Sequence, residues 1–242
     1  MEGEAPVSAN AFAVIILAAG QGRRFGSKLA KQFVPLGDTA DTCPMCLTVR
    51  FYTAFPGIRR VYLVLPEASR PCYDCCFKCS LGKVCFVTGG RTRQESSHNA
   101  VREAYKDGFR WVIIHEAVRP FVDAKAVRAV MRKLRQGAWS VVSTYLPPSA
   151  VFELQAGQVV RLMDRERVAL GQHPTGFLVS KLRQAHALSM WDKQRVFASD
   201  CALMLDTFDR KIEIVPGSPE GFKITHPEDL DLARYFYTRR HR

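Results

Sequence analysis

The chain has 242 residues, 47% of them hydrophobic and with charge spread through its length, so its composition excludes an extensively disordered protein. Its 35 Lys and Arg residues exceed its 23 Asp and Glu residues by 12, which favours polyanionic partners. The basic residues are dispersed and lack the aromatic-studded basic segment of a single-strand binder, so we expect nucleotides or sugar phosphates rather than dedicated nucleic-acid binding.

Runs of strand length that are rich in β-branched residues recur along the chain, with helical stretches between them. The strands are predicted over residues 13–17, 61–65, 83–87, 111–114 and 139–143. Between them, apolar residues at spacings of three and four predict helices over residues 44–54, 94–105 and 124–134. This alternation is typical of parallel β-α-β units. We therefore predict an α/β fold with a mostly parallel sheet covered by helices on both faces.

The pattern changes over residues 146–176. Residues 151–154 and 159–162 predict two short strands that meet at a turn around Gly157. A hairpin of this kind cannot bury both of its faces alone, so we expect a protruding arm that contacts a second subunit. Beyond the arm, the sequence predicts helices near residues 182–190 and 200–208, a strand over 212–215 and a final helix from Pro227 to about Tyr237.

The eight cysteines of the chain allow two interpretations. Several of them form Cys-x-x-Cys pairs, which are typical of zinc ribbons. These are Cys43, Cys46, Cys72, Cys75, Cys76 and Cys79. Alternatively they are buried structural thiols, because Pro44 suits the first position of a helix that turns Cys46 toward the core, and residues 72–79 fit a short helix between two strands. We favour structural thiols.

No apolar run reaches the roughly 18 residues that a membrane span needs. The apolar stretch over residues 11–19 ends in a glycine loop and has no basic region before it, unlike a signal peptide. We therefore expect a cytoplasmic protein without a membrane anchor. A chain of this length fits one catalytic domain, which we place over residues 1–242.

The sharpest local signal, Leu17-Ala-Ala-Gly-Gln-Gly-Arg-Arg24, directly follows a buried strand. Its small residues let the backbone approach a ligand closely, so that successive N–H groups can converge on an anion. They are Ala18, Ala19, Gly20 and Gly22. Arg24 and Lys31 would add positive charge. The loop is neither a Walker loop, which continues with Gly-Lys-Ser/Thr, nor a complete dinucleotide fingerprint, and we predict that it binds nucleotide phosphates.

Other motifs follow in chain order. They are Lys31-Gln-Phe33, Gly89-Gly-Arg-Thr-Arg-Gln-Glu-Ser96, His115-Glu-Ala-Val-Arg-Pro-Phe121, Gly217-Ser-Pro219 and Phe222-Lys-Ile-Thr-His-Pro-Glu-Asp229. With the glycine loop, they make nearly the whole chain similar to the 2-C-methyl-D-erythritol 4-phosphate cytidylyltransferases of isoprenoid biosynthesis and their CDP-ribitol-forming relatives. The resemblance implies a Rossmann-like nucleotidyltransferase fold, CTP and Mg²⁺ as partners, and a homodimer joined through the arm.

The resemblance also implies roles for particular residues. The cytosine and ribose would be framed, largely by backbone groups, by Ala18, Ala19, Gly20, Gly90, Arg91 and Ser96. Arg24 and Lys31 would hold the triphosphate, and Lys223 would bind the phosphate that attacks. The chemistry agrees, because phosphoryl-type transfer asks a protein mainly for positioning and for cations at the charged transition state.

The motif around His115 lies just past a strand, at the edge where open α/β sheets bind ligands. The family usually has aspartate where this chain has Glu116, next to the ribose and the metal. Glu116 is therefore the candidate for nucleotide contact and for Mg²⁺, with a side chain one methylene longer. For Arg119 we expect a structural ion pair that holds this loop.

The resemblance is weakest in the arm. Arg165 matches the arginine that the family delivers from the partner subunit to the acceptor phosphate. The isoprenoid enzymes also carry an Asp-Thr pair at the arm entry and a threonine before the following proline. Here the entry is Pro147-Pro-Ser-Ala150, and His173 precedes Pro174. The hydroxyl groups of the acceptor therefore need other partners.

These observations predict transfer of CMP from CTP to a polyol phosphate, by in-line attack of the acceptor phosphate on the α-phosphorus and with release of pyrophosphate. Methylerythritol phosphate is the first candidate acceptor, because the chain is one domain with no appended partner, and ribitol 5-phosphate is the second. A nucleotide-binding regulator without turnover is an alternative, since the altered arm could lose acceptor contacts. A zinc-dependent nucleic-acid binder is the third.

Overall fold

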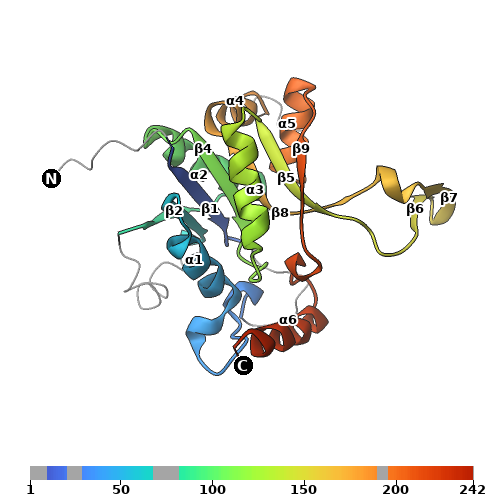
Figure 1. Cartoon of the computed structure of the whole chain (residues 1–242), viewed down its shortest axis with the longest axis horizontal. Coiled ribbons are helices and arrows are strands. Elements are labelled where there is room, and N and C mark those ends of the chain that lie inside the picture. The colour runs from blue at the N-terminus through green and yellow to red at the C-terminus, as the bar shows by residue number, and fades with distance from the viewer. Residues whose placement is uncertain (1–9, 21–28, 68–81, 190–195, 242) are drawn as a thin grey trace.

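The computed structural model describes residues 10–20, 29–67, 82–189 and 196–241 (Figure 1). Within this part of the chain, seven strands form one sheet in the order β3-β2-β1-β4-β8-β5-β9, and two more form a separate hairpin. The strands of the main sheet are β1 (Phe12–Leu17), β2 (Ile58–Leu65), β3 (Val84–Thr88), β4 (Trp111–Glu116), β5 (Ser140–Tyr145), β8 (Leu170–Leu178) and β9 (Glu213–Pro216).

Six α-helices are described in the same residues. They are α1 (Pro44–Ala54), α2 (Arg93–Lys106), α3 (Ala124–Arg135), α4 (Val179–Ser189), α5 (Asp200–Phe208) and α6 (Pro227–Arg240). Each strand and helix expected from the sequence is present with ends shifted by a few residues at most, apart from a short helix over residues 72–79, which lie outside the described part. None of the described helices has the length and apolarity needed to cross a membrane.

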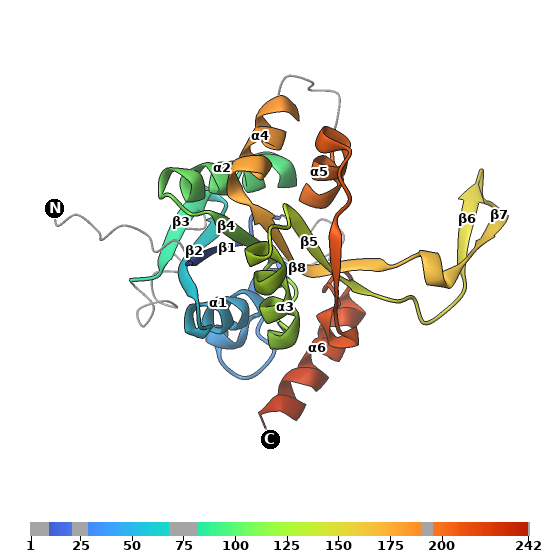
Figure 2. The ribbon, with the colours of Figure 1, turned by 45° about the horizontal axis from the view of Figure 1, so that its top comes forward.

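The sheet is mostly parallel and has helices on both faces, so the predicted Rossmann-like α/β fold is confirmed. Alternate residues of β1 point to opposite faces, and both sets are fully buried: Val14 and Ile16 belong to one core cluster, Ala13 and Ile15 to the other. Helices α1 and α3 cover the first face, and α2, α4 and α5 cover the second (Figures 1 and 2).

Strand β8 corrects the sequence analysis, which assigned all of residues 146–176 to the arm. It lies inside the main sheet, antiparallel to both β4 and β5. The sequence did not predict this strand, because its Gln172-His-Pro-Thr-Gly176 segment lacks an apolar alternation. Proline has no N–H to donate and is normally kept out of central strands. Gly176 is needed there, because an added Cβ would lie 2.3 Å from Cγ1 of Val130 on α3.

The remaining strands, β6 (Val151–Gln155) and β7 (Gln158–Met163), pair antiparallel as a two-stranded sheet. Their turn contains Ala156 and Gly157, both with positive φ. In Figures 1 and 2 this hairpin extends away from the main sheet. Apolar side chains on it are at least half exposed: Phe152, Leu154, Val159, Val160 and Leu162. Contact of this surface with a second subunit stays a prediction.

The described cysteines are free thiols. Cys43 is the N-cap of α1, Pro44 takes the first helical position and Cys46 is 1% exposed in the core, as the structural interpretation expected. Cys85 lies in β3. The four cysteines over residues 72–79 are outside the described residues.

Candidate functional site

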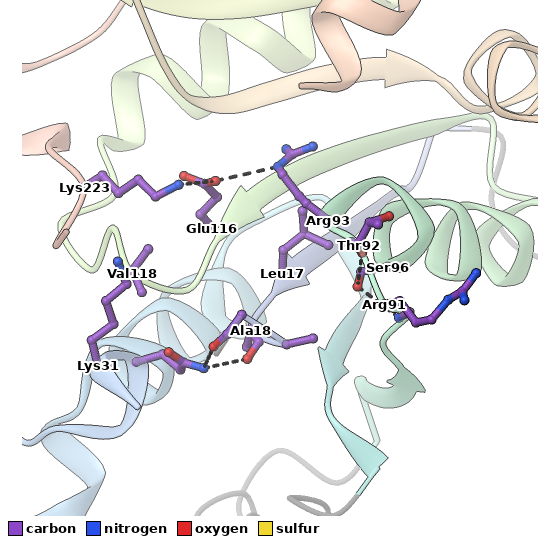
Figure 3. Close-up of a pocket in the computed structure, with 14 residues that line it drawn as sticks. Leu17, Ala18, Lys31, Arg91, Thr92, Arg93, Ser96, Glu116, Val118 and Lys223 are labelled. Carbon is purple, nitrogen blue, oxygen red and sulfur yellow. Dashed lines mark hydrogen bonds and ion pairs between the residues drawn. The ribbon is translucent and has the colours of Figure 1, made fainter. Parts of the chain in front are cut away.

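A cleft of about 550 Å³ opens where the carboxyl ends of β1 and β4 lie side by side. Because β1 has β2 on one side and β4 on the other, this edge is the topological switch point at which open α/β sheets bind ligands. Figure 3 shows the side chains around it. The lining residues are Leu17, Ala18, Ala19, Gly20, Lys31, Gln32, Gly90, Arg91, Thr92, Arg93, Ser96, Glu116, Val118 and Lys223.

Most residues that the sequence assigned to nucleotide binding and catalysis meet in this cleft. They are Ala18, Ala19, Gly20, Lys31, Gly90, Arg91, Ser96, Glu116 and Lys223. Gly22 and Arg24 lie outside the described residues. Arg165 lies apart from the cleft, in a 3₁₀ helix, η4 (Arg165–Arg167), that follows the hairpin. Their individual roles remain predictions.

A buried glutamine holds the backbone after β1. The side-chain amide of Gln32 donates hydrogen bonds to the carbonyl oxygens of Ala18 (2.8 Å) and Gly20 (2.9 Å). Gln32 is 2% exposed and lies in a 3₁₀ helix, η1 (Lys31–Phe33), which also brings Lys31 to the cleft. In the sequence analysis Gln32 appeared only as part of the Lys31-Gln-Phe33 motif. Its role in holding the loop after β1 follows from these two hydrogen bonds.

The turn between β3 and α2 forms another wall of the cleft. Thr92 caps α2 by accepting a hydrogen bond from the N–H of Glu95 (3.0 Å). The N–H of Gly90 donates to the Ser96 hydroxyl (3.0 Å), and the N–H of Arg91 donates to Oε2 of Glu95 (2.7 Å). Ser96 therefore shapes this turn as well as lining the cleft, and both backbone donors already have partners within the turn.

Glu116, the last residue of β4, is surrounded by basic side chains. Its Oε1 accepts a hydrogen bond from Nζ of Lys223 (2.8 Å), and its Oε2 accepts one from Nε of Arg119 (3.1 Å). Nε of Arg93 lies 3.7 Å from Oε1, and Nε2 of His173 lies 3.7 Å from Oε2. Burial raises the pKa of this carboxyl, but the surrounding basic groups outweigh burial and hold the pKa well below its usual value.

Arg119 joins the end of β4 to the C-terminal part of the chain. Its Nη1 donates to the carbonyl oxygen of Gly221 (2.7 Å), while its Nε bonds the carboxylate described above. A backbone bond from the N–H of Ile224 to the carbonyl of Val118 (3.0 Å) joins the same two segments. The expected structural ion pair of Arg119 is therefore confirmed, and it helps to place Lys223 in the cleft.

A second cavity, of about 290 Å³, adjoins the cleft. Arg93, Glu116 and Lys223 line both spaces. The other lining residues are Arg119, Val142, Gly171, Gln172, His173, Thr175, Ala198, Ser199, Asp200 and Cys201. The segment that the sequence analysis had placed in the arm, now β8, thus supplies one wall.

His173 presents one ring nitrogen as a hydrogen-bond acceptor in this second cavity. Its Nδ1 lies 3.0 Å from the carbonyl oxygen of Ile114, which can only accept, so Nδ1 carries the proton. Burial lowers the pKa of His173 to about 4, and the ring is therefore neutral at pH 7. Nε2 can accept a hydrogen bond from a hydroxyl group, as a threonine oxygen could.

One ion pair at the site had no signal in the sequence. Nη1 of Arg93 donates to Oδ2 of Asp200 (2.9 Å), across a separation of 107 residues. The hydroxyl of Ser97 donates to the other oxygen, Oδ1 (2.7 Å). Burial raises the pKa of Asp200, but Arg93 and the neighbouring donors outweigh it and hold the pKa well below its usual value. A single sequence has no pattern that pairs α2 with α5.

The fit of Mg²⁺ rests on Glu116, which is the one acidic side chain among the described residues that line the cleft. Mg²⁺ usually binds one or two protein carboxylates and completes its shell with water and substrate phosphate. A single carboxylate beside a cleft lined with basic side chains is compatible with this mode of coordination. Lys223 holds Oε1, so this ammonium group would have to share or release that oxygen.

Comparison with known proteins gives one consistent family. A model of the family described as 2-C-methyl-D-erythritol 4-phosphate cytidylyltransferase matches residues 12–239. The protein of that name from Carboxydothermus hydrogenoformans is 30% identical over 227 residues, which cover 93% of this chain and 95% of that protein. Its counterpart from Bacillus cereus is 31% identical over 229 residues, covering 93% and 97%.

Solved structures give the same picture. The 2-C-methyl-D-erythritol 4-phosphate cytidylyltransferase of Thermus thermophilus superposes with a TM-score of 0.74 at 28% identity, covering 93% of this chain and 98% of that one. The 4-diphosphocytidyl-2C-methyl-D-erythritol synthase of Anaerococcus prevotii has a TM-score of 0.82 at 19% identity, covering 95% and 97%. The second likeness shows the fold alone.

Proposed function

Because the chain belongs to the 2-C-methyl-D-erythritol 4-phosphate cytidylyltransferase family, we propose that its cleft transfers CMP from CTP to 2-C-methyl-D-erythritol 4-phosphate. The observation that carries this proposal is a cleft at the β1/β4 switch point with Lys31, Arg91, Arg93 and Lys223 against one carboxylate. Such an excess of positive charge suits a triphosphate and a second phosphate together.

The nucleotide occupies the first cleft. The backbone over Ala18 to Gly20, held by Gln32, approaches the cytidine and the phosphates. Lys31 lies at the triphosphate, and Arg24, which is outside the described residues, keeps the same role as an expectation from its motif. Lys31 begins η1 next to the glutamine whose amide holds the loop, so the same short helix places the cation and supports the loop backbone.

The acceptor occupies the second cavity, with its phosphate directed at Lys223. His173 supports this placement, because the neutral Nε2 can accept a hydrogen bond from an acceptor hydroxyl. In the reaction, a phosphate oxygen of the acceptor forms a bond to the α-phosphorus while the bond to the leaving pyrophosphate breaks. Neither partner needs to lose a proton, so the protein supplies position and positive charge.

Glu116 would hold Mg²⁺ through one carboxylate oxygen. When bound, the metal draws negative charge from phosphate oxygens. The same carboxylate orients Lys223 and Arg119 by the two hydrogen bonds already described.

The active enzyme in this proposal is a cytoplasmic homodimer of a single nucleotidyltransferase domain over residues 1–242. The apolar side chains of β6 and β7 are exposed on a two-stranded sheet, which is at best marginally stable alone. Docking on a second copy would bury them. Arg165, which does not line the cleft of its own chain, would then reach the acceptor phosphate of the partner.

The test is pyrophosphate release from CTP with a panel of acceptors. Methylerythritol 4-phosphate should be used fastest, ribitol 5-phosphate more slowly, and the unphosphorylated polyols not at all, because the nucleophile is the phosphate. Faster use of ribitol 5-phosphate would reassign the acceptor. Tight CTP binding without pyrophosphate release from any acceptor would instead favour a nucleotide-binding regulator.

A further inference from the structure

The two cavities meet at three side chains, which are Arg93, Glu116 and Lys223. In the reaction proposed above, the α-phosphate of the nucleotide and the phosphate of the acceptor must come together at this boundary. Repulsion between two anions rises as they approach, and most steeply in a partly buried site. A cation fixed at the boundary therefore acts at the point of greatest repulsion.

Arg93 is such a cation, and neither the sequence motifs nor the family resemblance gave it a role. It is the first residue of α2, and its side chain is 27% exposed. In Figure 3, Arg93 and Lys223 approach Glu116 from opposite sides. The distances differ, since Nζ of Lys223 lies 2.8 Å from Oε1 and Nε of Arg93 lies 3.7 Å from it.

The closer partner of Arg93 is Asp200, at 2.9 Å. Asp200 begins α5, is 2% exposed and has side chains of α2 and α4 next to its Oδ1. Ser97 of α2 donates to Oδ1 (2.7 Å), and Nε2 of His186 of α4 lies 3.2 Å from the same oxygen. With Oδ1 held in this way, Oδ2 is directed at the guanidinium. Three helices thus fix one end of an arginine whose side chain borders both cavities.

We propose that Arg93 is a catalytic residue that contacts the phosphates where nucleotide and acceptor meet, and that Asp200 is the positioning residue that holds it there. A guanidinium has five N–H donors in a planar fork, so one edge can bond a carboxylate while another edge faces phosphate oxygens. The inference rests on the proposed function, because it needs both phosphates at the boundary.

The competing explanation is that this ion pair only joins α2 to α5. A binding comparison that needs no turnover separates the two. The CDP-linked polyol, which is the product of the reaction, spans both cavities and places two phosphates at the boundary, whereas CMP occupies the first cleft and brings only one. Arg93→Lys keeps the charge but loses the fork, and it should weaken product binding at least about tenfold while changing CMP binding less than about threefold.

A matched control accompanies this variant. Arg60→Lys alters another partly buried ion pair, between Arg60 and Asp107 (2.7 Å), away from both cavities. Equal losses of CMP and product affinity in Arg93→Lys, or no loss, would overturn the proposal.

Kinetics test the positioning role of Asp200. Asp200→Asn should lower kcat at least about tenfold with little change in the KM for CTP, and Arg93→Lys/Asp200→Asn should be no slower than Arg93→Lys, since both changes act through one guanidinium. Losses that multiply, or kcat within about threefold of the unaltered protein, would contradict the proposal.

If Asp200→Asn does not fold, the binding comparison with Arg93→Lys decides alone. Absence of turnover in the unaltered protein would count against the proposed function, whereas the binding comparison would still test Arg93.

Discussion

Nζ of Lys223 lies 2.8 Å from Oε1 of Glu116, although 107 residues separate them in the chain. Glu116 ends β4, and Lys223 precedes α6 in a segment joined to the loop after β4 by a backbone hydrogen bond from Ile224 to Val118. The contact brings a cation from the C-terminal part of the chain to the switch point of the sheet. Replacing either residue therefore changes the charged surroundings of the other.

Lys223→Gln should lower kcat by at least about a hundredfold, the usual scale for removing one preorganised charge from a transition state. The glutamine can still bond Glu116, so thermal unfolding should change little. Steady-state pyrophosphate release and a melting curve measure the two effects. Lys211→Gln, at an exposed position outside both cavities, is the control. Turnover within about threefold of the unaltered protein would remove Lys223 from the transition state.

The sheet and the switch-point residues could be predicted because their signals are local. A buried apolar run ending in small residues predicts both β1 and the loop after it, and the motif at Glu116 likewise begins within the last residues of β4. Since parallel strands end at one edge, their loops must meet. The sequence thus placed Gly20, Lys31 and Glu116 in one cleft without knowing their distances.

Strand β8 and the pair of Arg93 with Asp200 could not be predicted for opposite reasons. β8 contains a proline within a polar segment, which is a local signal against a central strand. Pairing with β4 on one side and β5 on the other overrides this signal. The ion pair carries no local signal, because α2 and α5 come together through their packing on α4 and on the sheet. Tertiary contacts decide both features.

Gln32→Ala should raise the KM for CTP and reduce stability by about 1–3 kcal/mol, because the carbonyls of Ala18 and Gly20 lose their donor. Gln32→Glu should be worse than alanine, since a carboxylate would face two carbonyl oxygens. Urea unfolding gives the stability of each variant, and initial rates at increasing CTP concentrations give its KM. A Gln32→Glu protein that matches the unaltered one would show that this amide does not hold the loop.

Removal of divalent metal should abolish turnover and leave the fold intact. The proposed Mg²⁺ contact involves one carboxylate, and its oxygens are satisfied by Lys223 and Arg119 through hydrogen bonds. Melting curves with and without a chelator should therefore coincide, while added Mg²⁺ restores pyrophosphate release. Unfolding on chelation would point to a structural metal instead.

Stability should fall as the pH is lowered from about 6.5, in part through His115. Its Nε2 donates to the carbonyl of Arg119 (3.0 Å), so its Nδ1 accepts from the Tyr52 hydroxyl (3.0 Å). Burial lowers the pKa of His115 to about 3, from 6.5 for the ordinary side chain. The unfolded chain binds the extra proton between those values, which costs about 1.4 kcal/mol of stability per pH unit for this one group.

His115→Gln should therefore make the free energy of unfolding less dependent on pH, whatever it does to the value at about pH 7.5. Some dependence should remain, because burial also lowers the pKa of His173, to about 4. Urea unfolding at several pH values between about 7.5 and about 5 gives both slopes. An identical slope in the two proteins would mean that His115 titrates alike in the folded and unfolded chain.

The last prediction concerns sharing of the active site between subunits. Arg165 lies beyond the hairpin and does not line the cleft of its own chain, while the apolar side chains of β6 and β7 are exposed. In a symmetric dimer, each hairpin would dock on the other subunit and bring its arginine to the acceptor phosphate there, where a guanidinium can make two parallel hydrogen bonds. Lys31→Ala and Arg165→Ala should then each inactivate the homodimer.

Mixing these two inactive proteins under conditions that allow subunit exchange should restore activity. In each heterodimer one site combines both defects, and the other site pairs an intact Lys31 with an intact Arg165 from the neighbour. Random exchange makes about half of the dimers mixed, so about a quarter of the sites should work. The matched control mixes Lys31→Ala with Lys223→Gln, whose defects both lie in the cleft of their own chain, so every site keeps a defect and the mixture should stay inactive. Confirmed exchange without recovery in the first mixture would assign Arg165 to its own subunit or to no site.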